Sequence, residues 1–158
     1  MKILCCETLG VLLLAMTMEC STAMADDRIG GMQLLPGYKH QPLQGFDSVV
    51  GKISKPNGLE ISYEIGAIPK PGGLSLGGQF SDRPRLTPQD QRRWYQEQTV
   101  AGQKVHLVYR NDNYLLVSFP KQGMNLSVKV LTPDEMAEAL LMILTYPMAE
   151  KGEGKESK

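Results

Sequence analysis

The sequence has few of the residues from which common catalytic and metal sites are built. Its histidines are His40 and His106, and its cysteines are Cys5, Cys6 and Cys20. Neither histidine stands at a spacing typical of metal ligands, and the sequence has no Gly-x-Ser-x-Gly or phosphate-binding glycine motif. We therefore expect no metal ion and no cofactor, assign no catalytic residue, and favour a non-enzymatic role.

The chain also lacks an excess of either charge and a long apolar run. Lys and Arg number 17, as do Asp and Glu, so the formal net charge is 0. This balance argues against nucleic acid as a partner. The apolar run at residues 9–18 is shorter than the roughly 20 residues that a membrane-spanning helix needs. At 158 residues, the chain has room for one domain.

Residues 1–25 have the pattern of a signal peptide. Lys2 precedes the apolar run, and Ala23-Met24-Ala25 has the small residues that signal peptidase requires before its cleavage point. We expect cleavage after Ala25 and export to the periplasm or the medium, with no transmembrane segment in the mature chain. Two alternatives stay open: an uncleaved leader that anchors the chain, and lipid attachment at Cys20, where Glu19 departs from the lipoprotein pattern.

Cleavage would change the composition of the remaining chain. All three cysteines leave with residues 1–25, so the mature domain would have no disulfide and would depend on core packing. The loss of Lys2, Glu7 and Glu19 changes the formal net charge from 0 to +1.

A β-hairpin is predicted near the start of the domain. Residues 49–53 and 59–65 flank Lys55-Pro56-Asn57-Gly58, in which Pro suits the second turn position and Gly tolerates a positive φ. Apolar and polar residues alternate in the second run, as in a strand with one buried face. Residues 26–45 show no sustained period, so we interpret them as an irregular lead-in with room for one short strand near Tyr38.

Three further alternating runs predict an antiparallel meander over residues 104–110, 114–119 and 124–130. The middle run is apolar on both faces and is typical of a covered central strand. His106 falls on the polar side of its run, where we expect a solvated side chain.

Two Thr-Pro sequences predict helix starts. Thr132 and Glu135 form a capping box, and an apolar stripe follows until Pro147: Met136, Ala139, Leu140, Ile143 and Leu144. The stripe predicts a helix that packs across the sheet. Thr87-Pro88 predicts a second, short helix over residues 88–98, with Trp94 turned toward the core.

These elements predict an α+β fold: an antiparallel sheet of about five strands, a C-terminal amphipathic helix on one face and a short second helix. The single domain covers residues 46–147. Residues 148–158 are charged, lack apolar anchors and are interpreted as a disordered tail.

The candidate ligand site is a group of arginines beside the Gly- and Pro-rich residues 66–85. Arg83 and Arg85 precede the predicted second helix, and Arg92 and Arg93 lie in its first turns. A helix N-terminus with arginines beside it favours an anion, so we expect an anionic ligand or an acidic partner there.

Three functions fit the sequence. The first is an exported binding module for an unidentified protein or small molecule, through the uncovered sheet face or residues 66–85. The second is a small exported hydrolase with His106 or His40 as base, which requires a histidine and a carboxylate to converge in a pocket. The third is a structural envelope subunit that pairs with another subunit.

Overall fold

The computed structural model describes residues 28–29, 31–67 and 78–146. The predicted leader, the predicted tail and half of the Gly-rich stretch, residues 68–77, lie outside the described residues. The elements are, in chain order, β1 (Arg28–Ile29), β2 (Met32–Gln33), β3 (Lys39–Leu43), β4 (Val49–Ser54), β5 (Glu60–Ile65), α1 (Arg83–Leu86), the 3₁₀ turn η1 (Gln89–Gln91), β6 (Arg92–Val100), β7 (Gln103–Arg110), β8 (Tyr114–Phe119), the 3₁₀ turn η2 (Pro120–Gln122), β9 (Met124–Lys129) and α2 (Pro133–Ile143).

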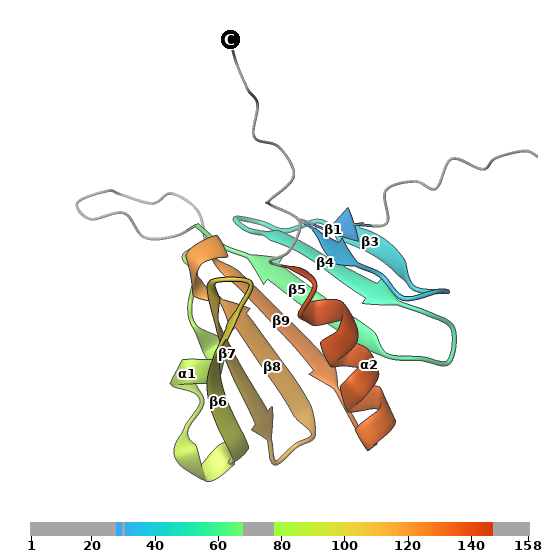
Figure 1. Ribbon diagram of the computed structural model, residues 1–158. Coiled ribbons are helices and arrows are strands. Elements are labelled where there is room, and N and C mark those ends of the chain that lie inside the picture. Colours follow the sequence, from blue (N-terminus) through green and yellow to red (C-terminus); the bar gives the residue numbers. More distant parts are fainter. Residues whose placement is uncertain (1–27, 30, 68–77, 147–158) are drawn as a thin grey trace, which may run out of the picture.

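One antiparallel sheet of seven strands forms the body of the molecule (Figure 1). Its strand order is β3-β4-β5-β9-β8-β7-β6, and β1 pairs with β2 in a separate two-stranded sheet. The predicted α+β class is confirmed, and so are the hairpin β4-β5 and the meander β7-β8-β9. The sheet has seven strands where about five were expected. The additional strands are β3 and β6.

The predicted helix over residues 88–98 is wrong. The chain makes only η1 before it enters β6, which pairs with β7 from Arg92 to Val100 with one register shift between Arg92 and Trp94. Thr87 does not cap a helix that follows: its hydroxyl donates to the carbonyl of Arg83 (2.8 Å) and closes α1. No apolar stripe follows Pro88, so pairing with a neighbouring strand decides the conformation. Trp94 packs against the core, as predicted.

The other additional strand, β3, lies within the predicted lead-in. It pairs with β4 from Lys39 opposite Ser54 to Leu43 opposite Val50. All five of its residues are exposed. Because neither face of β3 is buried, its sequence carries no alternation that would mark a strand.

The turn of the first hairpin has the predicted residues in a different backbone arrangement. The amide of Gly58 donates to the carbonyl of Lys55 (3.2 Å), which closes the turn with Pro56 at its second position. The positive φ falls on Asn57 (57°) rather than on Gly58. Asn tolerates the left-handed region better than most residues, which accounts for its place there.

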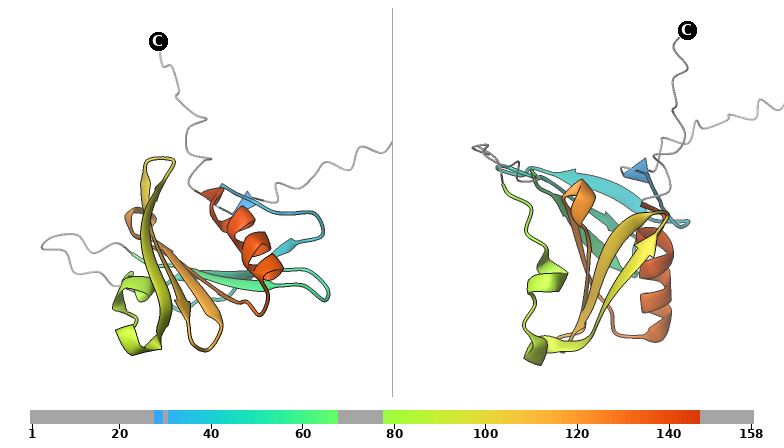
Figure 2. Two further views of the ribbon diagram at one scale, coloured as in Figure 1. Left: turned by 60° about the horizontal axis from the view of Figure 1, so that its bottom comes forward. Right: turned by 60° about the vertical axis from the view of Figure 1, so that its left-hand side comes forward.

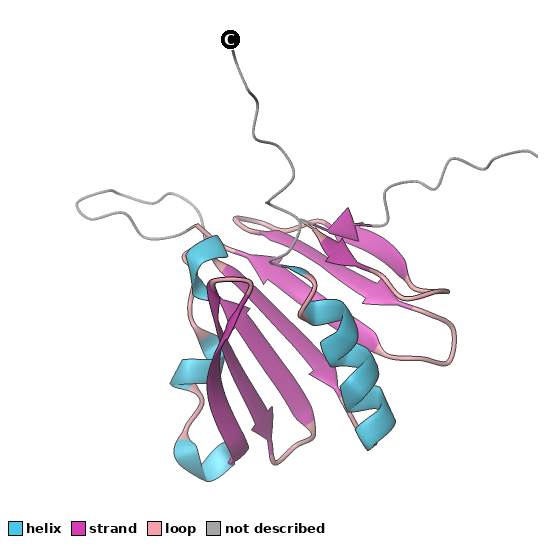
Figure 3. Ribbon diagram, viewed as in Figure 1, coloured by secondary structure: helices cyan, strands magenta, loops and turns pink. Residues whose placement is uncertain are grey.

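The two helices lie on opposite faces of the sheet, and the β6-β7 end of the sheet curls toward the side of α2 (Figure 2). Figure 3 shows the strands as the dominant element, with helices outside them. The main core lies between the sheet and α2, where Phe119 meets the ring of Tyr146. It also includes Met32, Tyr38, Ile53, Ile61, Leu115, Val117, Met124, Val128, Ala139, Met142 and Ile143.

The C-terminal helix forms as predicted. The Thr132 hydroxyl accepts from the amide of Glu135, and the Glu135 carboxylate accepts from the amide of Thr132, each at 3.2 Å. Ala139 and Ile143 are buried, and Met136 and Leu140 pack against the core. None of the helices in the described part of the chain has the length and apolarity that a membrane crossing requires.

Candidate functional site

A row of polar side chains crosses the sheet face that carries α1. In the strand register, Glu64 lies opposite Asn125, Asn125 opposite Ser118, Ser118 opposite His106, and His106 opposite Glu97. Directly opposed residues share a face, so the five side chains occupy one line from β5 to β6. Asn125, Ser118 and His106 are buried in the middle of this line. We call these five residues the polar row.

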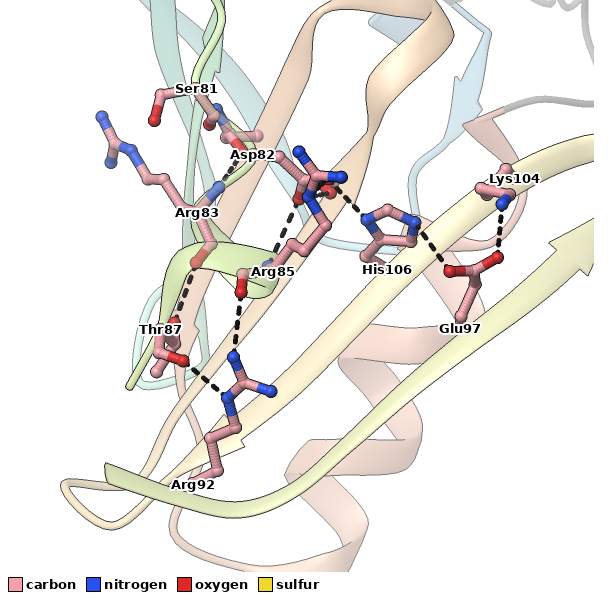
Figure 4. Close-up of polar contacts among 11 residues, drawn as sticks. Ser81, Asp82, Arg83, Arg85, Thr87, Arg92, Glu97, Lys104 and His106 are labelled. Atoms are coloured by element: carbon pink, nitrogen blue, oxygen red, sulfur yellow. Dashed lines mark hydrogen bonds and ion pairs between the residues drawn. The ribbon is translucent and has the colours of Figure 1, made fainter. Parts of the chain in front are cut away.

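Asp82, the N-cap of α1, lies over the centre of the polar row (Figure 4). One carboxylate oxygen accepts from the Ser118 hydroxyl (2.7 Å), and the other lies 2.6 Å from His106 Nδ1. Because an ionised carboxylate only accepts, His106 Nδ1 carries the hydrogen of this bond. The backbone amide of Arg85 donates to the Asp82 carboxylate (3.4 Å), and the Arg85 guanidinium lies 3.7 Å from the same carboxylate. The exposed fraction of Asp82 is 8%, so these partners hold a carboxylate that water barely reaches.

The prediction that His106 is solvated is wrong. Its strand alternates as expected, and His106 does face away from the α2 core, but only 4% of its surface is exposed. The covering segment is α1, which contacts β7 and β8. The burial therefore arises from a contact 24 residues away in the sequence, which the periodicity of the strand does not reveal.

The second nitrogen of His106 faces Glu97. Nε2 lies 3.4 Å from the Glu97 carboxylate and makes no hydrogen bond. Glu97 also pairs with Lys104 at 2.5 Å, and the hydrogen bond from Lys104 lowers the pKa of the Glu97 carboxyl. The Ser118 hydroxyl donates to Asp82 and not to this imidazole, so Ser118 and His106 do not form the pair of nucleophile and base that a serine hydrolase uses.

Asn125 and Glu64, at the β9-β5 end of the polar row, also bind the segment that contains α1. The Asn125 amide donates to the carbonyl of Ser81 (2.9 Å) and its oxygen accepts from the amide of Arg83 (3.4 Å). Glu64 forms an ion pair with Arg83 and accepts from the Ser48 hydroxyl (3.4 Å). Residues 81–87 are thus fixed to the sheet by side chains from four strands, β5, β7, β8 and β9.

Two of the four predicted site arginines, Arg85 and Arg92, lie side by side. The Arg92 guanidinium donates to the carbonyls of Thr87 (2.6 Å) and Arg85 (2.9 Å) and stacks on the ring of Tyr95 (4.8 Å). The Arg85 side chain is 68% exposed, so Arg85 is more accessible than Arg92, which is only partly exposed.

The other two predicted arginines point elsewhere. Arg83 turns to Glu64, whereas Arg93 donates to the Tyr109 hydroxyl and the Asn111 carbonyl, both at 3.2 Å. The four guanidinium groups therefore do not converge. The helix N-terminus expected behind them is also missing, because residues 92–100 form a strand. The anion site remains a prediction with a weaker structural basis.

A groove lies next to the polar row on the part of this face that α1 leaves open. Its volume is about 210 Å³, and it runs over β4, β5 and β9 between Leu43 and Arg83. A smaller hollow of about 80 Å³ adjoins it and shares Glu64, Arg83 and Asn125. Neither lining includes His106 or Asp82.

A third hollow, of about 500 Å³, lies at the β3 edge beside His40 and Lys55. His40 shares a 2.7 Å hydrogen bond with the Tyr63 hydroxyl, so this histidine also has a partner. Burial raises the pKa of Tyr63. Lys55 pairs with Glu138 of α2, and that hydrogen bond raises the pKa of Lys55. The side chains here mainly tie the β3-β4 end of the sheet to the core.

The described residues include no group of three His, Cys, Asp or Glu side chains placed to hold a metal ion. Comparison with protein-family models, curated protein sequences and solved structures gives no significant match. The polar row was missed at the sequence level because its members lie on five strands. One signal was present: Ser118 is a polar residue inside an otherwise apolar run.

Proposed function

We propose that this protein is an exported, non-enzymatic binding module. The observation that supports the proposal is the groove over β4, β5 and β9, which combines apolar, hydroxyl and charged side chains in one lining. Ligand sites commonly have this mixture, because apolar surface supplies affinity and a few polar groups fix orientation. Export is inferred from the leader sequence.

The chemistry of the groove favours a segment of a protein partner. Leu43 and Val50 supply apolar surface, and Ser62 and Ser127 supply hydroxyls. A volume of about 210 Å³ suits one inserted side chain better than a free drug-sized ligand. Phe46, between β3 and β4, is fully exposed and offers further apolar contact.

Charge adds a second element of recognition. The Arg83 side chain is 53% exposed at the boundary of the two adjoining hollows, and Glu64 is its partner there. A carboxylate of the bound segment would compete with Glu64 for this guanidinium. Of the four arginines predicted to bind an acidic partner, Arg83 therefore keeps that role in this proposal.

The experiment is capture from extracts of the native host, with the parent protein and two arginine variants as bait. Val50→Arg fills the groove, whereas Ala137→Arg adds the same charge on the exposed side of α2. We expect a partner that the parent and Ala137→Arg retain and Val50→Arg loses, followed by the same order in direct binding to that purified partner. Equal recovery with both variants would contradict a role for the groove.

A hydrolase is the second candidate, favoured by the convergence of His106 and Asp82. The burial of both groups weighs against it, and so does the Ser118 hydroxyl, which donates to Asp82 rather than to His106. Ester and peptide substrates offered to the parent and to His106→Gln test this alternative. Turnover by the parent that His106→Gln abolishes, at unchanged fold by circular dichroism, would favour the hydrolase over the binding module.

A further inference from the structure

The buried imidazole of His106 lies between two carboxylates from different elements (Figure 4). Nδ1 lies 2.6 Å from Asp82, in the segment of residues 81–87, and Nε2 lies 3.4 Å from Glu97 on β6. Nε2 is buried and makes no hydrogen bond. A neutral ring with its hydrogen on Nδ1 therefore satisfies Asp82 and leaves Nε2 unsatisfied.

A proton on Nε2 would make both sides of the ring favourable. In the neutral ring Nε2 only accepts, as does the ionised carboxylate of Glu97, so neither group offers the other a hydrogen. The hydrogen bond from Lys104 lowers the pKa of the Glu97 carboxyl, which favours its ionised form. The imidazolium has a hydrogen on each nitrogen and a positive charge between the two carboxylates. The charge also strengthens the bond to Asp82, because a charge-assisted hydrogen bond is about twice as strong as a neutral one.

The other charged and titratable groups around His106 come from α1, β6, β7 and η2. The Arg85 guanidinium lies 3.7 Å from one of the two carboxylates, and Lys104 pairs with the other. The ring of Tyr95 lies 6.2 Å from the imidazole, and burial raises the pKa of this tyrosine, so it stays neutral below its usual range. η2 contacts β7 and carries Lys121. These cations oppose a charged ring by repulsion, whereas the two carboxylates stabilise it at shorter range.

We propose that protonation of His106 tightens the attachment of residues 81–87 to the sheet. The imidazolium joins Asp82 on that segment to Glu97 on β6, whereas the neutral ring keeps only the bond to Asp82. The added stability is therefore present in acid and is lost as the pH rises from 5 to 8, the range in which histidine ordinarily changes charge. This inference does not depend on the groove, whose lining includes neither His106 nor Asp82.

Amide hydrogen exchange of the purified protein, followed by NMR at pH 5 and pH 8, tests the proposal. The amides of Leu86 and Thr87 donate to carbonyls within the segment, each at 3.0 Å, so they report its local opening. Their protection, relative to an unstructured chain at the same pH, should fall about tenfold from pH 5 to pH 8, the usual difference between a charged and a neutral hydrogen bond. The amide of Leu144 in the last turn of α2, on the other face of the sheet, is the internal control and should keep its protection. Constant protection at Leu86 and Thr87, or an equal loss at Leu144, overturns the proposal.

Three variants assign the effect to its groups. Glu97→Gln removes the charge that attracts the imidazolium and offers Nε2 of the neutral ring an amide hydrogen, so the change in protection should shrink to about threefold. Glu60→Gln is the matched control, because Glu60 and Glu97 are strand residues that each pair with a lysine of the neighbouring strand. Glu60→Gln and His40→Gln should both keep the tenfold change. A change that Glu97→Gln leaves intact, one that His40→Gln removes, or a His106 ring signal that does not move between pH 5 and pH 8 overturns the proposal.

Discussion

At the residue scale, Asp82 shows how a carboxylate can be kept almost out of water. Three separate parts of the chain direct donors at it: Ser118 on β8, His106 on β7 and Arg85 on α1. The same carboxylate begins α1, so one side chain both caps the helix and fixes it to the sheet. Because every donor that Asp82 needs is in place, this buried carboxylate fixes one position for the segment that contains α1. A buried carboxylate that lacked some of its hydrogen bonds would not fix the segment in this way.

Replacement of Asp82 by alanine should therefore be strongly destabilising. It leaves the buried Ser118 hydroxyl and His106 imidazole without their acceptor, and each buried donor left unsatisfied costs about 1–3 kcal/mol. Urea unfolding followed by circular dichroism measures the change. Asp90→Ala, at an exposed position eight residues away, should stay within about 0.5 kcal/mol. Equal effects of the two substitutions would show that Asp82 does not hold α1.

Gly51 makes a second residue-scale prediction. A Cβ at this position would lie 2.4 Å from the Tyr63 hydroxyl oxygen and 2.6 Å from two ring carbons, so the glycine provides the space through which the tyrosine reaches His40. Gly51→Ala should cost about 1–3 kcal/mol, as overpacking usually does. The cost should largely vanish in a Tyr63→Ala background, where the clash is gone. A double-mutant cycle in urea detects this coupling, and additive effects would contradict it.

At the element scale, the comparison of β6 with α2 separates what the sequence could predict from what it could not. Both follow a Thr-Pro pair. Thr132 is followed by a stripe at helical spacing, so local chemistry and packing agree and the helix was predicted correctly. Thr87 is followed by no such stripe, and the conformation of residues 92–100 depends on β7, which lies later in the chain.

The same division holds for the candidate site. The hairpin was predictable because β5 buries one face and alternates accordingly. The meander strands are buried on both faces, but their sequences still showed the alternating and apolar runs that mark strands. The polar row was not predictable, since only the register of five strands brings Glu64, His106 and Glu97 into one line. Register between strands far apart in sequence is fixed by the packed fold rather than by any local pattern.

The capping box of α2 can be tested directly. Thr132→Ala removes the acceptor of the Glu135 amide and should lower stability by about 1 kcal/mol, the usual value of an N-cap. Thr132→Ser keeps the hydroxyl and should retain most of the stability that the N-cap provides. Chemical unfolding of the three proteins under one set of conditions gives the comparison. If serine behaved like alanine, the hydroxyl would not be the stabilising group.

At the scale of the whole molecule, the folded chain should lose stability in alkali. Burial raises the pKa values of Tyr38, Tyr63 and Tyr95, and the hydrogen bond to Glu138 raises that of Lys55. Each group therefore holds its proton more firmly in the folded chain than in the unfolded chain. The resulting stability is complete below about pH 10, the ordinary tyrosine value, and is lost as the pH rises through the folded pKa values.

Urea midpoints measured from pH 8 to pH 11 should be constant at first and then fall. Tyr63→Phe removes one of the four groups, so its midpoint should fall less steeply over the same range. The comparison separates the contribution of Tyr63 from general alkaline effects, because the other three groups are unchanged. A midpoint that stays level to pH 11, or an identical slope for the variant, would mean that the buried hydroxyls do not govern the alkaline limit of the fold.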